Sequence, residues 1–214
     1  MKKYLGTGGA SAFAAVMLLT VGGSGQALAQ QVTELPLVQA VVKTTTAVPT
    51  TTAAPLTSDQ AVAREAGMLQ GAGWPLYALV DKFSAGAPMT DEANCIAVAV
   101  YHEARGESLE GQLAVAKVIM NRAASGKYPS SWCGVVKQPW QFSFVNPRSG
   151  QYPAVDAASA AWRKALGVTR LAVANAVQTV PTDCLWYHAD YVAPSWGRRL
   201  TKVNKIGAHI FYRA

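Results

Sequence analysis

Residues 101–107, YHEARGE, place a histidine, two glutamates and an arginine within seven positions. This set of residue types could transfer protons, because a carboxyl group whose pKa is raised towards neutrality can serve as a general acid. Cleavage of a glycosidic bond needs such an acid to protonate the leaving oxygen. A glutamate of this motif would suit that role only where its surroundings raise its pKa.

Glu103 meets this condition if the apolar run before it, CIAVAV, forms a helix that ends within the motif. It follows Ile96 by seven residues and Ala99 by four, so the three side chains share one helical face. Burial and the negative end of the helix dipole would both raise the pKa of Glu103. We expect Glu103 to be the catalytic acid; the alternative is a structural acid paired with Arg105 or a C-terminal lysine.

Glu107 and His102 are weaker candidates. Glu107 would share a face with Glu103 if the helix continued, but Gly106 makes continuation doubtful. A structural role is favoured for Glu107, at the N-terminus of the next helix or holding Arg105, and a second acid is its alternative role. His102 faces away from Glu103 on a helix, so we expect it to form local hydrogen bonds.

Two successive helices would position the motif. Thr90 can cap the first, and Gly106 is suited to follow its end. Ser108 can cap the second helix, which runs to a stop at Gly126 and is apolar on most sides. This pattern predicts that the second helix lies at the centre of the core.

The remaining patterns predict a mainly α fold with a small irregular or β portion. Residues 127–153 are rich in Pro, Gly and aromatic residues, which excludes long elements. Helices are expected at 58–70, with Ser58 as N-cap, and at 154–166, whereas residues 205–213 predict a strand or extended segment with a bend at Gly207.

The first 29 residues are typical of an export signal. Lys2 and Lys3 precede an apolar stretch over residues 10–21, and an A-x-A site occupies residues 27–29. The apolar stretch is short for a membrane span, although a retained N-terminal anchor is the alternative and would bring the protein to a membrane. We therefore expect action in the periplasm, cell wall or extracellular space.

Three further regions follow the signal. Residues 30–57 form a Thr/Ala/Pro-rich linker with almost no charge. Residues 58–89 are expected to be a short helical segment of unclear role, and residues 90–214 to be the main domain. A monomer is expected.

The chain is basic, with a formal net charge of +7. Loss of residues 1–29 removes two lysines and no acids, which leaves 17 − 12 = +5. An exported basic protein meets anionic wall polymers rather than nucleic acid, although the charge could also serve only solubility. No metal-binding spacing is present and the three histidines are scattered, so no metal or cofactor is expected.

The three cysteines are Cys95, Cys133 and Cys184. In an oxidising compartment they would form one disulfide and leave one free thiol. Spacing alone ranks none of the three possible pairings.

Residues 90–214 resemble the catalytic domain of the SleB/CwlJ-type cell-wall hydrolases. The similarity rests on EARGE, the following GQLAVAKVIMNR, QFSF, and the C-terminal WYHADYVAPSWGRRLTKVNKIGAHIFYR. It implies a compact, mostly helical, lysozyme-like fold that acts on the glycan strands of peptidoglycan. It also assigns the catalytic acid to Glu103.

The resemblance implies lytic transglycosylation between N-acetylmuramic acid and N-acetylglucosamine by a single glutamate. A hydrolytic muramidase would need a second acid, for which Glu107, Asp190 and Asp156 are the candidates. A non-catalytic peptidoglycan-binding module is a further alternative.

The same resemblance places Gln141, Ser143, Tyr187 and His188 along a sugar-binding cleft, with Tyr101 as a further candidate. Core packing is the alternative for each aromatic residue. Trp140 stands where a number of relatives carry a cysteine, so their disulfide pattern does not transfer. We favour Cys133 paired with Cys184, which would tie the aromatic loop to the second wall of the cleft.

Overall fold

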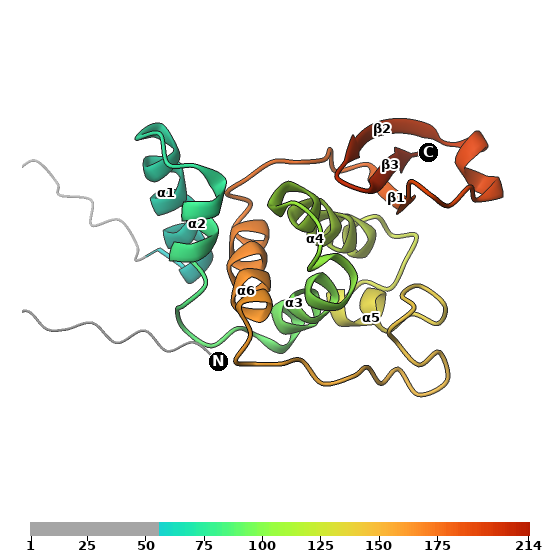
Figure 1. The fold of residues 1–214 in the computed structure, drawn as a ribbon, viewed down its shortest axis with the longest axis horizontal. Coiled ribbons are helices and arrows are strands. Elements are labelled where there is room, and N and C mark those ends of the chain that lie inside the picture. The colour runs from blue at the N-terminus through green and yellow to red at the C-terminus, as the bar shows by residue number, and fades with distance from the viewer. Residues whose placement is uncertain (1–55) are drawn as a thin grey trace, which may run out of the picture. The chain divides into compact units, whose positions relative to one another are not determined.

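The computed structural model describes residues 56–214, so the predicted signal peptide and nearly all of the predicted linker lie outside the described residues. Figure 1 shows helices packed together, with a small sheet at one end. The elements are α1 (Ser58–Gly71), α2 (Leu76–Lys82), α3 (Asp91–Ala104), α4 (Leu109–Ala124), α5 (Trp132–Val136), α6 (Ala160–Val173), β1 (Cys184–Ala189), the 3₁₀ helix η1 (Ser195–Arg199), β2 (Thr201–Ile206) and β3 (His209–Arg213).

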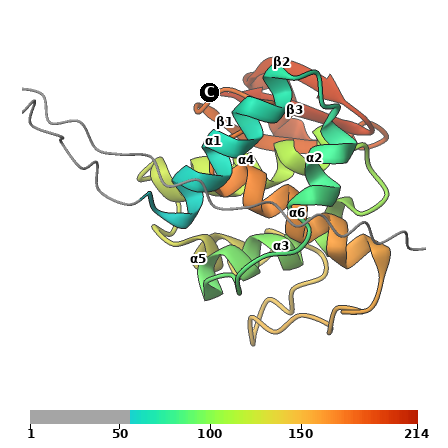
Figure 2. The same cartoon turned by 90° about the vertical axis from the view of Figure 1, so that its left-hand side faces the viewer.

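This architecture confirms the predicted fold class, mainly α with a small β portion. The helix α3 packs against α4, α5 and α6, and most of its residues are buried (Figures 1 and 2). The helix α4 is buried along most of its length, as its apolar composition predicts. Among the described residues, no helix combines the length and apolar character that a membrane crossing needs.

The capping residues set the ends of the two central helices as predicted. The Thr90 hydroxyl accepts a hydrogen bond from the Ala93 amide at 3.2 Å, and the Ser108 hydroxyl accepts one from the Gly111 amide at 3.2 Å. Each bond satisfies a donor that the helix leaves free at its N-terminus. The turn between the helices therefore holds the second half of the YHEARGE motif.

The predicted third helix is displaced. It was expected at 154–166, but α6 spans Ala160–Val173. Asp156 forms a turn in which its carboxylate accepts from the Ala158 amide at 3.1 Å. The Ser159 hydroxyl then accepts from the Trp162 amide at 3.1 Å, so Ser159 is the N-cap. The start of α1 is also displaced slightly, because its N-cap is Thr57 instead of Ser58.

The segment 58–89 packs into the same core as the rest. Ala66, Leu79 and Val80 are buried with residues of α3, α4 and α6. Gly167 of α6 lies so close to α2 that a Cβ atom there would collide with the carbonyl oxygen of Val80. The segment is thus a packed part of the compact unit that contains α3.

The sheet has the strand order β1-β3-β2, with antiparallel neighbours. Strands β2 and β3 form a hairpin that turns at Gly207, whose φ of +57° favours glycine, as the predicted bend requires. Two polar residues of α4 hold β1. The Asn121 amide donates to the Cys184 carbonyl at 3.1 Å, and Arg122 Nε donates to the Leu185 carbonyl at 2.7 Å.

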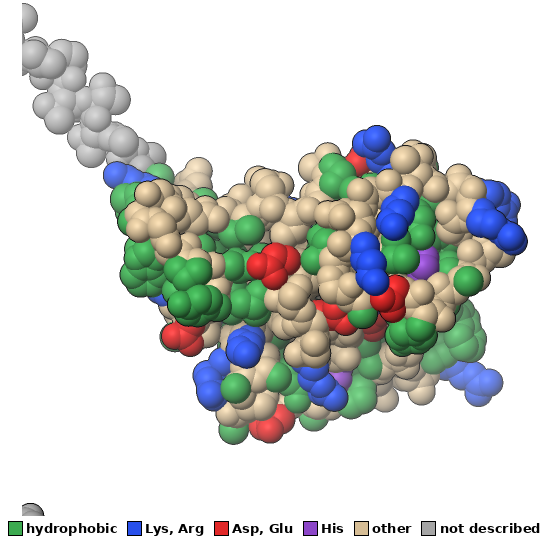
Figure 3. Space-filling view, turned by 45° about the horizontal axis from the view of Figure 1, so that its top comes forward, with side chains coloured by type: hydrophobic (Ala, Val, Ile, Leu, Met, Phe, Trp, Pro, Cys, Tyr) green, Lys and Arg blue, Asp and Glu red, His purple; other side chains and the backbone are tan. Residues whose placement is uncertain are grey.

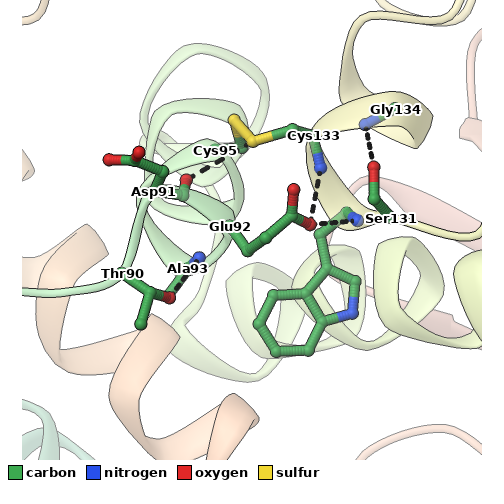
Figure 4. Close-up of a disulfide and its surroundings, with 9 residues drawn as sticks. Thr90, Asp91, Glu92, Ala93, Cys95, Ser131, Cys133 and Gly134 are labelled. Carbon is green, nitrogen blue, oxygen red and sulfur yellow. Dashed lines mark hydrogen bonds between the residues drawn. A yellow bond between two sulfur atoms is a disulfide. The ribbon is translucent and has the colours of Figure 1, made fainter.

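The predicted disulfide is wrong, because Cys95 pairs with Cys133 (Figure 4). Oε2 of Glu92 accepts from the Trp132 amide at 2.6 Å and from the Cys133 amide at 3.2 Å. This carboxylate caps α5 and brings Cys133 beside Cys95, one turn along α3. Cys184 is a buried free thiol, and burial raises its pKa to about 11.

Candidate active site

A cavity of about 370 Å³ lies where the end of α3 meets the 141–143 loop and the sheet. We call it the Glu103 pocket. It brings together six of the predicted site residues, namely Glu103, Glu107, Gln141, Ser143, Tyr187 and His188. A larger hollow of about 780 Å³ lies between α1, α6 and residues 85–93, and none of the predicted site residues lines it.

Glu103 is partly buried in the last turn of α3. Burial raises the pKa of Glu103, while the nearby His209 and a hydrogen bond from Tyr187 act in the opposite direction. Burial is the largest of these effects, so the carboxyl group holds its proton to higher pH than an ordinary glutamate. The raised pKa agrees with the sequence-based expectation.

Tyr187 connects the sheet to Glu103. Its hydroxyl donates a hydrogen bond to Oε1 of Glu103 at 3.3 Å. The pKa of Tyr187 is raised well above its usual value, first by burial and then by the charge of Glu103. Its ring lies 5.5 Å from that of Phe211 and 5.1 Å from that of His209. Tyr187 therefore stays a neutral donor in a fixed position.

The alternative of a structural ion pair at Glu103 finds no partner within residues 56–214, where the salt bridges join other residues. Arg105 is exposed, and its guanidinium lies 5.0 Å from the centre of the Tyr101 ring. Tyr101 itself is buried, packs against Trp162 and accepts from the Asp156 amide at 3.4 Å. The prediction that Tyr101 lines the cleft is wrong, because its ring belongs to the core.

Glu107 holds the β2–β3 hairpin. Its Oε2 accepts a hydrogen bond from the Ala208 amide at 2.8 Å, and a Cβ atom at Gly207 would collide with this oxygen. Its backbone carbonyl accepts from the Gln112 side chain at 3.1 Å. This arrangement supports the structural role favoured for Glu107, with the hairpin as its partner in place of Arg105.

The other candidate acids lie outside the Glu103 pocket. Asp190 forms a salt bridge with Lys205 at 2.7 Å, and this partner lowers the pKa of Asp190. Asp156 caps the turn before α6. Within residues 56–214, Glu107 is therefore the one other acid that lines the pocket with Glu103.

Both predicted histidines have structural hydrogen bonds. His188 Nδ1 lies 2.8 Å from the Ala189 carbonyl oxygen, and its Nε2 lies 2.9 Å from the Tyr212 hydroxyl. His102 Nε2 lies 3.1 Å from the Pro153 carbonyl oxygen, so its partner is 51 positions away and not the local one that was expected. Burial is the main cause that lowers the pKa of His102, which favours its neutral form.

Sequence reasoning missed four residues of the pocket, namely Ala189, Tyr191, Ala208 and His209, and it did not place His102 there, although His102 also lines the pocket. His209 is buried on β3, and its Nδ1 has no hydrogen-bond partner among the described residues. The alternation of side chains along the last strand could have indicated that His209 is buried, because His209 and Phe211 are two residues apart and share one face. Nothing in the sequence singled out Tyr191, which lies in the turn after β1.

No group of three metal-ligating side chains converges within the described part of the chain. The Glu103 pocket contains groups that can transfer protons and form hydrogen bonds. It combines one acid with a raised pKa, one neutral phenol donor and the amide and hydroxyl groups of Gln141 and Ser143.

Residues 106–212, half of the chain, match the model of the cell wall hydrolase family. The matched range begins three residues after Glu103. The chain is 35% identical over 126 residues to the spore cortex-lytic enzyme of Bacillus subtilis (strain 168), which covers 56% of this chain and 37% of the relative. The corresponding enzyme of Oceanobacillus iheyensis is 34% identical over 124 residues, with 56% and 41% covered.

The chain thus spans about two fifths of the length of these relatives. Among solved structures, the catalytic domain of the Bacillus cereus SleB protein is 30% identical, with a TM-score of 0.47, and the similarity covers 61% of this chain and 96% of that one. The catalytic domain of the germination-specific lytic transglycosylase SleB from Bacillus anthracis has the same identity and TM-score, with 60% and 99% covered.

Proposed function

This chain belongs to the cell wall hydrolase family, and from that premise we propose that it cleaves the glycan strands of peptidoglycan with Glu103 as general acid. The observation that carries this proposal is the setting of Glu103, a partly buried carboxyl group that lines a pocket and has no cationic side chain in salt-bridge contact within residues 56–214. Burial there raises the pKa of Glu103. The curated relatives named as spore cortex-lytic enzymes support a substrate of this class.

We propose that the reaction is lytic transglycosylation. Protonated Glu103 would give its proton to the oxygen that bridges N-acetylmuramic acid and N-acetylglucosamine, as the bond from that oxygen to the muramoyl C1 breaks. The muramoyl O6 would then bond to C1 while the Glu103 carboxylate takes the proton from the C6 hydroxyl. This closes a 1,6-anhydro ring and restores the acid.

The carboxylate that forms between the two steps needs stabilisation. The Tyr187 hydroxyl donates to Oε1 of Glu103, and His209 also favours the ionised form. Burial favours the protonated form that begins the cycle. These opposed effects suit one carboxyl group that first donates and then accepts a proton.

A hydrolytic muramidase is the second candidate. It would require a group that activates water, and Glu107 is the other acid in the pocket among residues 56–214. The hydrogen bond that Glu107 accepts from Ala208 favours a structural role instead. We therefore place the transglycosylase first.

Gln141 and Ser143 are proposed to form hydrogen bonds with sugar, and His188 to contact it through the ring, since all three line the pocket and both His188 nitrogens are held by Ala189 and Tyr212. Tyr187 is proposed to act on substrate through Glu103. Figure 3 shows Lys and Arg side chains spread over one face among acidic and apolar ones, which would give general attraction to anionic wall polymers. The proposed site of action is outside the cytoplasm.

Mass spectrometry of digested peptidoglycan tests the proposal. Transglycosylation leaves anhydro-muramoyl ends, whereas hydrolysis leaves reducing ends that are heavier by one water. Anhydro ends that disappear with Glu103→Gln would support the proposal. Reducing ends would favour the hydrolase, and binding to sacculi without release of fragments would favour the non-catalytic binding module.

A further inference from the structure

Two aromatic residues, one that lines the Glu103 pocket and one that precedes a pocket residue in sequence, are far more exposed than packing requires. Trp140 and Tyr191 are each 86% exposed, the highest values among the exposed large hydrophobic side chains of the described residues. Tyr191 lines the pocket, and Trp140 directly precedes Gln141, which also lines it. An exposed aromatic ring keeps apolar area in water, so folding gives no reason for either side chain.

The backbone at Trp140 makes this placement costly. The Gln141 amide donates to the Gln138 carbonyl at 3.1 Å, so residues 138–141 form a tight turn with Pro139 as its second residue. Trp140, the third residue, has a φ of +66°. Glycine or asparagine usually occupies such a position, because a side chain with a Cβ atom is crowded there. A bulky residue in this conformation points to function.

Tyr191, which lines the pocket, is likewise the third residue of a tight turn. The turn after β1 is closed by the Val192 amide, which donates to the Ala189 carbonyl at 2.9 Å. Asp190, the residue before Tyr191, is held by two contacts. Its amide donates to the Ala208 carbonyl at 2.7 Å, and its carboxylate pairs with Lys205. Two tight turns, one that contains the pocket residue Tyr191 and one that ends at the pocket residue Gln141, thus each present an exposed ring.

We propose that Trp140 and Tyr191 are stacking platforms for pyranose rings of the glycan strand, and that they extend the binding site beyond the cleaved bond. A glycan strand fits because its sugar rings have apolar C–H faces, and it must pass through the pocket for Glu103 to reach a bridging oxygen. Tyr191 lines that pocket, and Trp140 adjoins it in sequence through Gln141. This inference rests on the proposed function and names how the site holds more than one sugar.

The test uses Trp140→Gly, Tyr191→Ala and the double variant, each with and without Glu103→Gln. Trp74→Ala and Tyr77→Ala are matched controls, because both side chains are exposed and neither lines the Glu103 pocket. Binding to purified sacculi is measured by sedimentation with the Glu103→Gln proteins. Release of fragments is measured with the proteins that retain Glu103.

We expect each single variant to bind sacculi up to about tenfold more weakly, and the double variant to bind more weakly than either, since a stacked aromatic contact is worth up to about a tenfold change in affinity. We also expect a higher KM for fragment release and little change in kcat. The melting temperature of Trp140→Gly should rise, because glycine suits the positive φ. A structural role for Trp140 predicts a fall instead.

The stacking role of Trp140 and Tyr191 would be refuted if the double variant bound sacculi as tightly as the protein with both rings. The proposed function would still hold if the double variant that retains Glu103 released fragments. Equal losses in the Trp74 and Tyr77 controls would also refute the stacking role. No release of fragments by the unaltered protein would overturn the proposed function, and with it this inference.

Discussion

The Tyr187 hydroxyl donates a hydrogen bond to Oε1 of Glu103 at 3.3 Å, which joins the sheet to the end of α3. The two residues are 84 positions apart in sequence. The bond stabilises the carboxylate form of Glu103, whereas burial favours the protonated form. The balance of the two sets the pH range in which the acid carries its proton.

Replacement of Glu103 by glutamine should abolish bond cleavage. Glutamine keeps the size of the side chain and an oxygen for the Tyr187 hydrogen bond, but it cannot donate a proton as an acid does. General acid catalysis contributes about 10²–10⁴-fold, so we expect at least a hundredfold loss of fragment release. Release of soluble fragments from sacculi measures the loss, and binding of the variant to sacculi is the control. Retained activity would contradict the assignment.

The same variant should be more stable than the unaltered protein at neutral pH. Because the pKa of Glu103 is raised in the folded state, its ionisation destabilises the fold as pH rises from the unfolded to the folded pKa. Glu103→Gln removes this destabilisation, because glutamine does not ionise. Thermal unfolding should show a higher melting temperature at pH 7 and a vanishing difference below about pH 4, where the carboxyl group is protonated in both states. A difference that grew on acidification would have the wrong sign.

Replacement of Tyr187 by phenylalanine should shift the pH dependence of kcat/KM to higher pH. Activity that needs protonated Glu103 falls as pH rises through the pKa of that group. The Tyr187 hydrogen bond lowers the pKa of Glu103, so its removal should shift the alkaline limb of kcat/KM to higher pH. Tyr152→Phe is the matched control, because Tyr152 does not line the Glu103 pocket. A shift to lower pH, or an equal shift in the control, would refute the role of Tyr187.

Glu107 can be tested by two substitutions with different consequences. Glu107→Gln keeps an oxygen that can accept from the Ala208 amide, so the fold and fragment release should persist. Glu107→Ala leaves that amide without its partner, which should cost about 1–3 kcal/mol of stability in chemical denaturation. If Glu107→Gln unfolds like the unaltered protein but loses activity, Glu107 is a catalytic acid and the hydrolase becomes the better proposal.

Local patterns predicted the elements around Glu103 well. Thr90, Ser108 and Gly207 each act within a few residues of their position, so the helix starts and the hairpin bend follow from the sequence. Glu103 could be selected for the same reason, since helical spacing alone places it on the apolar face of α3. The third helix was displaced because Asp156 and Ser159 form a turn that delays its start.

Contacts between distant segments were not predictable in this way. Tyr101 was placed in the cleft, but its side chain turns into the core against Trp162 of α6. The partner of Glu107 is an amide 101 positions away, which no spacing indicates. The disulfide joins α3 to α5, at a contact where the Glu92 carboxylate of α3 also accepts from the first amides of α5, 40 and 41 positions away.

The Cys95–Cys133 bond should contribute strongly to stability. It closes a loop with a sequence separation of 38 residues, for which the loss of chain entropy in the unfolded state predicts about 3–4 kcal/mol. Joint replacement of Cys95 and Cys133 by alanine should lower the free energy of unfolding by roughly this amount, and reductant should lower the melting temperature of the unaltered protein. Chemical denaturation with and without reductant measures both effects.

Cys184 provides the control for the disulfide, because it is the free cysteine. It is buried and its pKa is raised to about 11, so it should resist thiol reagents in the folded protein. Without reductant, unfolding should expose one reactive thiol among the three cysteines. Cys184→Ala should keep the sensitivity to reductant. If that variant loses the sensitivity instead, Cys184 takes part in the disulfide and the pairing across α3 and α5 is wrong.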